Sequence, residues 1–536
     1  MKMPPVVDHR FGVTPSVTIA RSKFDRSHTL KTTLETGGVL YPIFVDEVLP
    51  GDTFNLRASL FARLSTPLKP ILDNLYLDTF FFFIPNRLVW TNWQKFCGEQ
   101  TNPGDSISFT IPTVPVAAGG AVVGTLLDYM GIPTGAQITA GFNISALATR
   151  SYNLVWNSWF RSEDLQNSVT VDTGNGPDTL ANYVLLSRGK RHDYFTSGLP
   201  YPQKGNTAVT IPAGAASAPI TLVPYTTSTN AFIVKKASDD SLTGGQTLRR
   251  KDTTGILTDT ASQTVDMTMD PNGRLIADLS SAFATTINAL RLAEQTQVLL
   301  ERDARGGTRY PEILRSHFGV TSPDQRLQRP EILALGSSPV NFHPVPNTAV
   351  ASGGTAAGQQ GNLAAFATSS ANGVGFSKSF VEHGTILGLC MVRADLTYQQ
   401  GVDRMWSRST RYDFYWPSLA HIGEQSILNK EIWTQGTAAD SNVFAYQERY
   451  AEYRFKKSMI TGKFHSDYAT PLDVWHVSQR FTSLPTLGDT FIKETPPISR
   501  IVAVPSEPQF FLDAYFNLKC ARPLPVYGIP TLGARI

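Results

Sequence analysis

The sequence predicts a mostly β protein: an eight-stranded, antiparallel jelly-roll β-sandwich with long loop insertions that carry several short helices. Two segments near opposite ends of the 536-residue chain, 54–64 and 510–520, alternate apolar and polar side chains almost without interruption. Helical periodicity is confined to segments between the expected strands. Long stretches rich in Gly, Ser, Thr and Ala separate these elements, and together the three observations favour a sandwich.

Several segments favour strands. The even positions are apolar in both 54–64 and 510–520. A period of two places one face of a strand against a core and the other toward water or a partner. We expect these two segments to be neighbours in one sheet, because the first and last strands of a jelly roll pair. Residues 75–84 are aromatic on both faces and should be buried on both sides. Further strand patterns lie at 39–45, 386–392 and 451–456.

Four segments favour helices. Residues 86–97 repeat apolar side chains at helical spacing, and Asn86 can cap this helix while Gly98 can stop it. The other three carry apolar stripes at the same spacing, and the last of them should stop at Gly319. They cover residues 145–160, 283–302 and 311–317.

The chain is expected to form one domain preceded by an arm. Residues 1–31 form a basic N-terminal arm, and residues 32–536 form a single jelly-roll domain. Within it, residues 204–272 change character. Residues 205–232 are small, polar, β-branched and nearly uncharged, which indicates that 204–272 is a short-stranded excursion built from hairpins. Residues 346–375 contain no charged side chain and are expected to form a low-complexity loop.

Charge is scarce and unevenly distributed. Charged residues make up 17% of the chain, below the roughly 25% of typical soluble proteins. The formal net charge of +3 is too small to indicate a nucleic-acid binder by itself. Residues 1–31, however, hold six basic and two acidic side chains, a net charge of +4. Such an arm is either a solvated terminus or a segment that lies on an acidic polymer or a neighbouring subunit.

Cysteine usage and hydropathy restrict the environment. Cys97, Cys390 and Cys520 are far apart and contain no C-x-x-C motif. We therefore expect neither a disulfide framework nor a zinc site. We expect the chain to reside in a reducing compartment, with Cys390 and Cys520 buried. No secretory signal is visible, and no stretch approaches the roughly 18 apolar residues of a membrane helix, so membrane insertion is not expected.

Motifs that carry chemistry are not visible in the sequence. The nine histidines form no H-E-x-x-H or H-x-H pattern, and no G-x-S-x-G elbow is present. We therefore expect no enzyme activity, no catalytic or metal-binding residue and no cofactor. Closely spaced charges at the end of the longest helix favour a salt-bridge network between helices or subunits. Its expected members are Glu301, Arg302, Asp303 and Arg305.

Six sequence blocks carry a family resemblance. They include YNLVWNSWFRSEDL, HDYFTSGLPYPQKG and FAYQERYAEYRFKKSMITG. In this order along the chain, the blocks resemble the major capsid proteins of gokushoviruses, which are Microviridae that infect bacteria. The blocks cover residues 21–93, 152–165, 192–205, 299–330, 444–462 and 522–530.

The resemblance implies a viral jelly roll that assembles through pentamers into a T=1 icosahedral shell of sixty copies around circular single-stranded DNA. It also implies that residues 204–272 are the family's variable insertion, which projects outward around the threefold axes and meets a host-surface receptor. The chain would then be a virion component that is assembled in the host bacterial cytoplasm.

Charge adds a constraint to this expectation. Sixty copies with a net charge of +3 carry +180, whereas a genome of thousands of nucleotides carries one negative charge per phosphate. A small basic DNA-packaging protein, polyamines or metal ions must supply the remaining positive charge. We expect the arm to face the interior. Its expected DNA-facing residues are Lys2, Arg10, Arg21, Lys23 and Arg26.

Two other interpretations compete with a shell protein. A carbohydrate-binding or carbohydrate-cleaving β-sandwich needs convergent acids and exposed aromatic side chains in one cleft, and usually a secretion signal. A DNA-binding protein that acts as a monomer is disfavoured by the weak net charge. Particle size separates these classes, because a shell protein forms large closed particles or pentamers and an enzyme elutes near 58.7 kDa or as a small oligomer.

Overall fold

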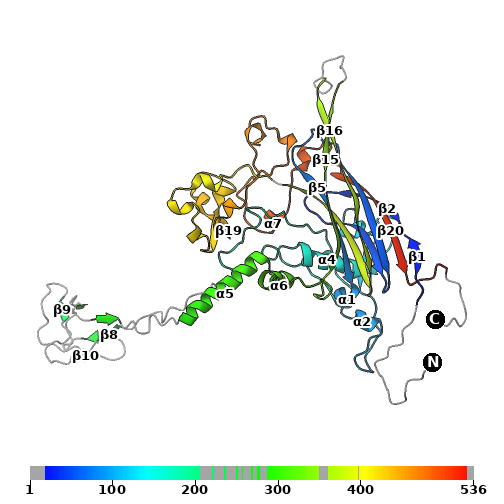
Figure 1. The fold of residues 1–536 in the computed structure, drawn as a ribbon, viewed down its shortest axis with the longest axis horizontal. Helices are drawn as coiled ribbons and strands as arrows, with labels where there is room; N and C mark the ends of the chain where they lie inside the picture. Colours follow the sequence, from blue (N-terminus) through cyan, green and yellow to red (C-terminus); the bar gives the residue numbers. More distant parts are fainter. Residues whose placement is uncertain are drawn as a thin grey trace. The chain divides into compact units, whose positions relative to one another are not determined.

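The computed structural model describes residues 19–205, 287–348, 360–395 and 397–527, together with the backbone of six short strands between residues 220 and 277. The chain divides into two compact units. One comprises residues 203–305, and the other comprises Met1–Pro202 and Gly306–Ile536. The second unit holds a β-sandwich (Figure 1).

The sandwich consists of two antiparallel sheets. The larger sheet has six strands in the order β1–β20–β4–β16–β15, with β2 also paired to β20. Their bounds are β1 (Ser22–Asp25), β2 (His28–Leu34), β4 (Thr53–Leu64), β15 (Asn341–Pro346), β16 (Leu363–Ser379) and β20 (Phe510–Arg522). The smaller sheet has four strands in the order β14–β5–β17–β3. Their bounds are β3 (Tyr41–Val48), β5 (Leu75–Pro85), β14 (Glu331–Pro339) and β17 (Gly384–Ala394).

The chain winds back and forth between the sheets. Strands β2, β4, β16 and β20 lie in the larger sheet, and β3, β5, β14 and β17 lie in the smaller one. This is the winding of a jelly roll, and it confirms the predicted mostly β, antiparallel sandwich. The sheets hold six and four strands, two more than the predicted eight. The excess arises because β1 and β2 pair with successive parts of β20, and β15 adds an edge to β16.

Strands β4 and β20 are the two segments with the clearest alternation. The even-numbered side chains of both are buried between the sheets, and most odd-numbered ones are exposed. Their antiparallel register places Phe54 opposite Cys520 and Leu64 opposite Phe510, which confirms that they are neighbours. Cys390 and Cys520 are both buried, as expected, and Cys97 is exposed.

The smaller sheet is covered on both faces. Phe81 and Phe83 of β5 pack in the core between the sheets. Phe80 and Phe82 pack on the opposite face against α1 (Asn86–Val89) and α4 (Leu147–Val155). The two-sided burial predicted for residues 75–84 is therefore confirmed, and the outer face of the larger sheet is the exposed face of the sandwich.

The helices agree with the prediction, except that one expected helix is split into two. The remaining helices are α2 (Trp93–Phe96), α3 (Leu126–Tyr129), α5 (Ile287–Gly306), α6 (Tyr310–Phe318) and α7 (Asp489–Ile492), and a π-helix (Trp156–Phe160) continues α4. The expected helix at 86–97 is split into α1 and α2. Trp90 between them is extended because its buried indole donates a hydrogen bond to Asn175 Oδ1 at 2.9 Å. Gly319 ends α6 in the left-handed region with φ 69°, as predicted.

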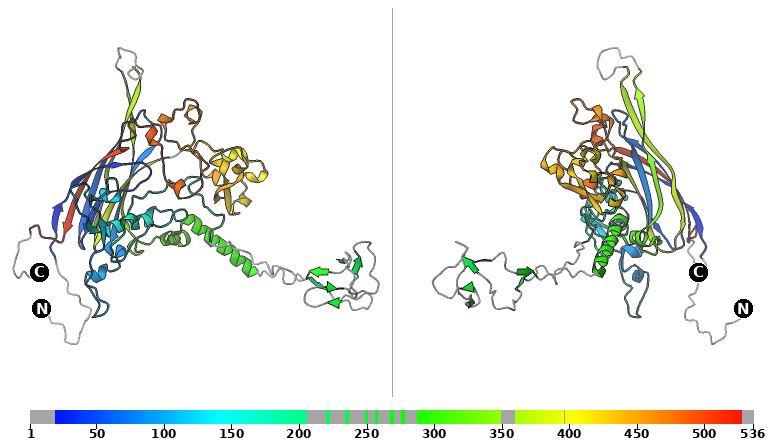
Figure 2. Two further views of the ribbon diagram at one scale, coloured as in Figure 1. Left: turned by 180° about the vertical axis from the view of Figure 1, so that it is seen from behind. Right: turned by 60° about the vertical axis from the view of Figure 1, so that its left-hand side comes forward.

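The prediction of a loop over 346–375 is wrong from residue 363 onward. That part is strand β16, which pairs with β4 along most of its length and with β15 at its start (Figure 2). Its core-facing side chains include Ala365, Ala367 and Ala371, which are weak strand formers. Pairing with two neighbouring strands overrides the weak strand preference of these alanines. The low-complexity composition hides the strand from a reading of the sequence.

Two further expectations need correction. Residues 451–456 do not form a strand: Ala451–Tyr453 is a 3₁₀ turn that follows Tyr450 in the left-handed region, and Ala451 is buried in a third apolar core. The arm is not separate from the domain along its whole length, because β1 and the start of β2 pair with β20. The predicted arm residues 1–18, and Phe283 of the expected long helix, lie outside the described residues.

The remaining strands form small antiparallel sheets. Two of these are β6 (Thr113–Val116) with β7 (Phe142–Ser145), and β18 (Glu424–Leu428) with β19 (Val443–Glu448). In the 203–305 unit, β8 pairs with β13, β9 with β12 and β10 with β11, which is a nested order of hairpins. Their bounds are β8 (Ile220–Leu222), β9 (Val234–Lys236), β10 (Arg249–Arg250), β11 (Ile256–Leu257), β12 (Met267–Met269) and β13 (Leu275–Ala277).

Candidate nucleic-acid interface

The outer face of the larger sheet concentrates positive charge. Side chains of β1, β2, β4 and β20 that point away from the core include five cations and two acids. We call this surface the cationic face; its charged members are Lys23, Lys31, Arg57, Arg63, Lys519, Asp25 and Asp513. Its net charge of +3 equals that of the whole chain. Asp25 lies opposite Lys519 and Asp513 lies opposite Lys31, so the cations of this face without an acid directly opposite are Lys23, Arg57 and Arg63.

Aromatic side chains lie between these cations. On the outer face Phe61 is opposite Asp513 of β20, and its diagonal neighbours on that strand are Phe511 and Tyr515. Phe61 is 48% exposed and Tyr515 46% exposed. Exposed aromatic rings next to unpaired cations are the combination that binds single-stranded nucleic acid, because rings stack on bases and cations neutralise phosphates.

The predicted DNA-facing residues are dispersed by the fold. Lys23 joins the cationic face through β1. Arg26 does not, because its guanidinium donates two hydrogen bonds to the Asp46 carboxylate of β3 at 2.5 and 2.9 Å. Arg21 precedes β1 and is exposed, and Lys2 and Arg10 lie outside the described residues. The ion pair with Asp46 neutralises Arg26 within the chain, so Arg26 is a poor candidate for a phosphate contact.

Sequence reasoning left Lys31, Arg57, Arg63 and Lys519 out of the expected interface. The signal was present in the alternation, which places Arg57 and Arg63 on the polar side of β4 and Lys519 on the polar side of β20. The alternation does not reveal the strand register, which places β2, β4 and β20 side by side.

The predicted salt-bridge residues Glu301, Arg302, Asp303 and Arg305 all lie near the end of α5. Glu301 accepts a hydrogen bond from Gln297 at 3.1 Å within the same helix. A network of these four between helices or subunits stays a prediction.

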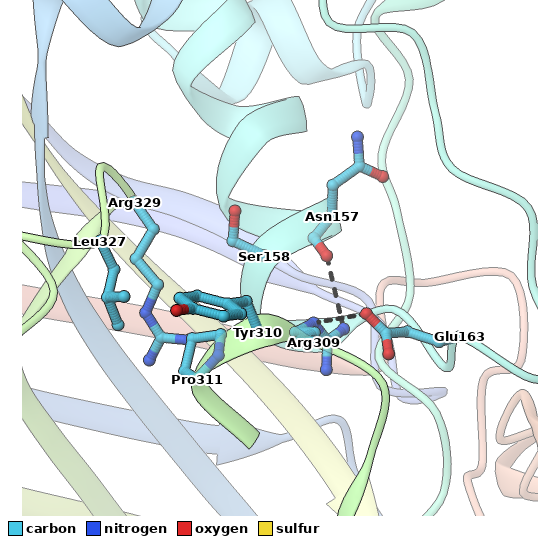
Figure 3. Close-up of a pocket in the computed structure, with 8 residues that line it drawn as sticks. All are labelled: Asn157, Ser158, Glu163, Arg309, Tyr310, Pro311, Leu327 and Arg329. Carbon is cyan, nitrogen blue, oxygen red and sulfur yellow. Dashed lines mark hydrogen bonds and ion pairs between the residues drawn. The ribbon is translucent and has the colours of Figure 1, made fainter. Parts of the chain in front are cut away.

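A well-connected charged cluster lies just beyond them in the sequence. Arg309 Nε is 3.3 Å from the Glu163 carboxylate, and Nη2 donates to the backbone carbonyl of Asn157 at 3.4 Å (Figure 3). The Glu163 carboxylate also accepts hydrogen bonds from the backbone and hydroxyl of Thr308. The adjacent Asp164 accepts a hydrogen bond from the Tyr201 hydroxyl at 2.6 Å. Neighbouring carboxylates therefore hold the two chain segments that flank residues 203–305.

A small cavity lies beside this cluster. Its volume is about 280 Å³. Arg329 borders it and packs over the Trp159 ring, 3.9 Å from the ring centroid, and is ion-paired with Asp324. The lining residues are Asn157, Ser158, Glu163, Arg309, Tyr310, Pro311, Leu327 and Arg329 (Figure 3). Because its charged groups already pair with each other or with nearby residues, we assign the cavity to the anchoring of the chain.

Buried Glu494 is the acidic residue that most clearly links the stability of the fold to pH. It accepts a hydrogen bond from the backbone N–H of Ala394 at 3.2 Å. Burial raises the pKa of Glu494 to about 7. Burial also lowers the pKa of nearby Lys190 to about 8, and the ammonium of Lys190 lies 4.4 Å from the Phe491 ring centroid.

We expect Glu494→Gln to flatten the pH dependence of stability. Because the pKa of folded Glu494 lies above its ordinary value of 4.5, the folded chain keeps a proton that the unfolded chain has lost. That stabilisation is complete below pH 4.5 and is lost as the pH rises through 7. Its loss amounts to roughly 3 kcal/mol between pH 4 and pH 8. Urea unfolding at pH 5 and pH 8 measures the difference. Glu507→Gln, at an exposed site, is the control and should leave the pH dependence unchanged.

Metal sites and membrane-spanning helices are two features by which the described residues can be compared with other classes of protein. In those residues, no group of three or more His, Cys, Asp or Glu side chains has the arrangement of a metal site. Among the described helices, none has both the length and the apolar character needed to cross a bilayer.

An antiparallel jelly-roll sandwich of this kind is an architecture found in viral capsid proteins, among other classes. A family model described as "Capsid protein (F protein)" matches residues 13–532. The chain therefore belongs to this family of phage capsid proteins, and its role is structural rather than enzymatic.

The chain is also similar over its full length to three curated proteins named "Capsid protein VP1". It is 49% identical to that of Bdellovibrio phage phiMH2K, with 98% of each chain covered. It is 40% identical to that of Chlamydia phage 1, with 99% of each covered. It is 34% identical to that of Spiroplasma virus 4, with 98% of this chain and 97% of the relative covered. The predicted membership of the gokushovirus major capsid proteins is confirmed.

Proposed function

We propose that the chain assembles, through pentamers, into a T=1 icosahedral shell of sixty copies that encloses the circular single-stranded DNA genome of a bacterial virus. The observation that carries the DNA-enclosing part is the cationic face, where Lys31, Arg57, Arg63 and Lys519 lie on adjacent strands and five cations face two acids. The covered smaller sheet leaves this face as the broad surface of the sandwich that a polyanion can approach.

The cationic face is directed toward the interior in this proposal. Phosphates pair there with the cations, and unpaired bases stack on Phe61, Phe511 and Tyr515. With a net charge of +3 per chain, the shell neutralises only a small part of the genome, so a small basic packaging protein accompanies the DNA. The shell assembles in the host bacterial cytoplasm.

The 203–305 unit is the host-attachment element in this proposal. It contains the 204–272 stretch, of which residues 205–232 carry no charged side chain, and short nested hairpins. The segments that flank it are fixed to Glu163 and Asp164, so its sequence can vary without disturbing the sandwich. A surface receptor of the host is the expected partner.

Purified chain, mixed with circular single-stranded DNA, is expected to form closed particles many times heavier than the 58.7 kDa monomer. Sedimentation velocity measures the mass, and negative-stain microscopy measures the shape. Enclosed DNA should resist added nuclease, while DNA mixed with heat-denatured chain should be digested. A chain that remains monomeric at all salt and DNA concentrations contradicts the proposal, and turnover of a polysaccharide would favour the carbohydrate-active alternative.

A further inference from the structure

Two asparagine–glycine pairs lie in the part of the chain that the structure describes, and the fold holds them differently. One is Asn372–Gly373 in β16, and the other is Asn175–Gly176 in the loop at residues 174–178. A third pair, Asn272–Gly273, lies outside the described residues. Such a pair can modify itself, because the backbone nitrogen of the glycine can attack the side-chain amide carbon of the asparagine. Glycine favours this attack, since it has no Cβ to obstruct the approach.

The pair in β16 lies in a β-bulge. Asn372 and Val374 are opposite consecutive residues of β4, so Gly373 between them has no partner residue on that strand. On the other side of β16, the pairing with β15 extends only as far as Thr368. Gly373 has φ 81°, and a Cβ built on it would meet no atom within 4 Å. The side chain of Asn372 is exposed and donates a hydrogen bond to Ser370 Oγ at 3.2 Å. The two reacting groups therefore lie in an open, interrupted part of the strand.

The pair in the 174–178 loop is held more firmly. Oδ1 of Asn175 accepts hydrogen bonds from the Trp90 indole and from the Asn92 side chain, both at 2.9 Å. A Cβ built on Gly176 would lie 3.1 Å from the backbone nitrogen of Thr113, so the chain is closely packed there. The same dipeptide thus occurs once with its amide fixed and once with its amide accessible.

We propose that Asn372 is a site of self-modification, at which the chain converts a neutral amide of its surface into a carboxylate. The backbone nitrogen of Gly373 loses its proton to hydroxide and bonds to Cγ of Asn372. The bond from Cγ to Nδ2 breaks, and the displaced nitrogen takes a proton from water and leaves as ammonia. The resulting succinimide ring then takes up one water molecule, which opens it to an aspartyl or an isoaspartyl residue at position 372.

The new charge lies in the cationic face. Asn372 is directly opposite exposed Ser59 of β4, and directly opposite side chains share a face. Arg57 and Phe61 flank Ser59 on that face. Five cations and two acids give the face a net charge of +3, and one further acid reduces it to +2. Modification therefore weakens a phosphate contact near Arg57. This consequence, unlike the modification itself, rests on the proposed contact of the face with DNA.

The test incubates the folded, full-length chain at mildly alkaline pH and then measures the masses of its proteolytic peptides. The Asn372 peptide should gain the mass difference between an amide and a carboxylic acid, and isoaspartyl methyltransferase should label it. The Asn175 peptide should react at least about tenfold more slowly, because two hydrogen bonds have to break first. In urea both pairs should react at similar rates, since the fold causes the difference. An Asn372 peptide that reacts no faster than the Asn175 peptide in the folded chain overturns the inference.

Two variants separate the modification from its effect on DNA. Asn372→Gln keeps a neutral amide but is one carbon too long for this ring, so its peptide should keep its mass. Asn372→Asp carries the charge of the product and should bind a single-stranded oligonucleotide about fourfold more weakly at 0.15 M salt, as expected for the loss of about one phosphate contact. Urea midpoints within error of the wild type establish that both variants are folded.

Incubated wild type should approach the affinity of Asn372→Asp, and incubated Asn372→Gln should bind as it did before. Loss of affinity in incubated Asn372→Gln contradicts the assignment of the effect to this residue. If Asn372→Asp binds as the wild type does, the proposed DNA contact is wrong and the site of modification stands on the peptide masses. The two failures are therefore distinguishable.

Discussion

Arg150→Met is expected to lower the free energy of unfolding by about 3–5 kcal/mol, because it leaves a buried carboxylate without its partner. Arg150 is fully buried in α4. Its Nε and Nη2 donate hydrogen bonds to the two oxygens of Asp178 at 2.8 and 2.6 Å. Its Nη1 donates to the carbonyls of Val89 and Gly174 at 3.0 and 2.9 Å. One side chain therefore ties α1, α4 and the 174–178 loop together over the smaller sheet.

The state of Asp178 explains the size of the effect. Burial by itself would raise the pKa of Asp178, but hydrogen bonds from Arg150 and Tyr183 hold it below its ordinary value. A depressed pKa means that the pair stabilises the fold above the ordinary carboxyl pKa and loses this contribution as the pH falls through the folded pKa. Without Arg150, Asp178 either stays charged in an apolar setting or takes up a proton at a cost.

Urea unfolding at pH 7 measures the change as a lower transition midpoint. Arg480→Met is the matched control, since its ion pair with Asp467 is at least half exposed on both sides and should contribute under about 1 kcal/mol. The double variant Arg150→Met with Asp178→Leu should recover part of the loss, because two apolar side chains leave no buried charge. Equal midpoints for Arg150→Met and Arg480→Met would contradict the assignment.

Replacing Lys31, Arg57, Arg63 and Lys519 with glutamine is expected to weaken binding of single-stranded DNA on the order of a hundredfold at 0.15 M salt. Each cation that neutralises a phosphate releases a counterion, so binding falls as salt rises with a slope of about −0.7 per contact on single strands. Loss of four contacts should therefore reduce the slope of the log–log plot by roughly 3. Fluorescence anisotropy with an oligonucleotide, from 0.05 to 0.3 M salt, measures both quantities.

The fold should tolerate this change, because the four side chains point away from the core. The control removes four exposed cations elsewhere and lowers the net charge equally. It replaces Arg326, Arg454, Lys456 and Arg480 with glutamine. If the control weakens binding as much as the test variant, attraction depends on total charge and the cationic face has no special role. An unchanged salt slope in the test variant would also refute the assignment.

Local sequence patterns predicted most of the sandwich. Alternation identified β4 and β20 and the faces that they bury, since successive side chains of a strand necessarily point to opposite sides. Aromatic residues at consecutive positions predicted the two-sided burial of β5. Alternation is weak in β16, where alanines face the core, because small side chains give little contrast between buried and exposed positions.

The site was less predictable than the fold. A basic arm suggested Arg26 as a DNA contact, yet Arg26 pairs with Asp46 across the sandwich edge. The sequence contains both residues, but nothing in it shows that the two side chains lie close enough to pair. Conversely, Lys31, Arg57 and Lys519 are far apart in the sequence, and each alone is an ordinary exposed cation.

By itself, then, the amino-acid order determined which segments are strands, which of their faces are apolar, and that the chain resembles a capsid protein, because these depend on residue type and short-range spacing. Tertiary structure alone decided which cations share a surface and which are neutralised, because charges interact through space and register brings together residues hundreds of positions apart.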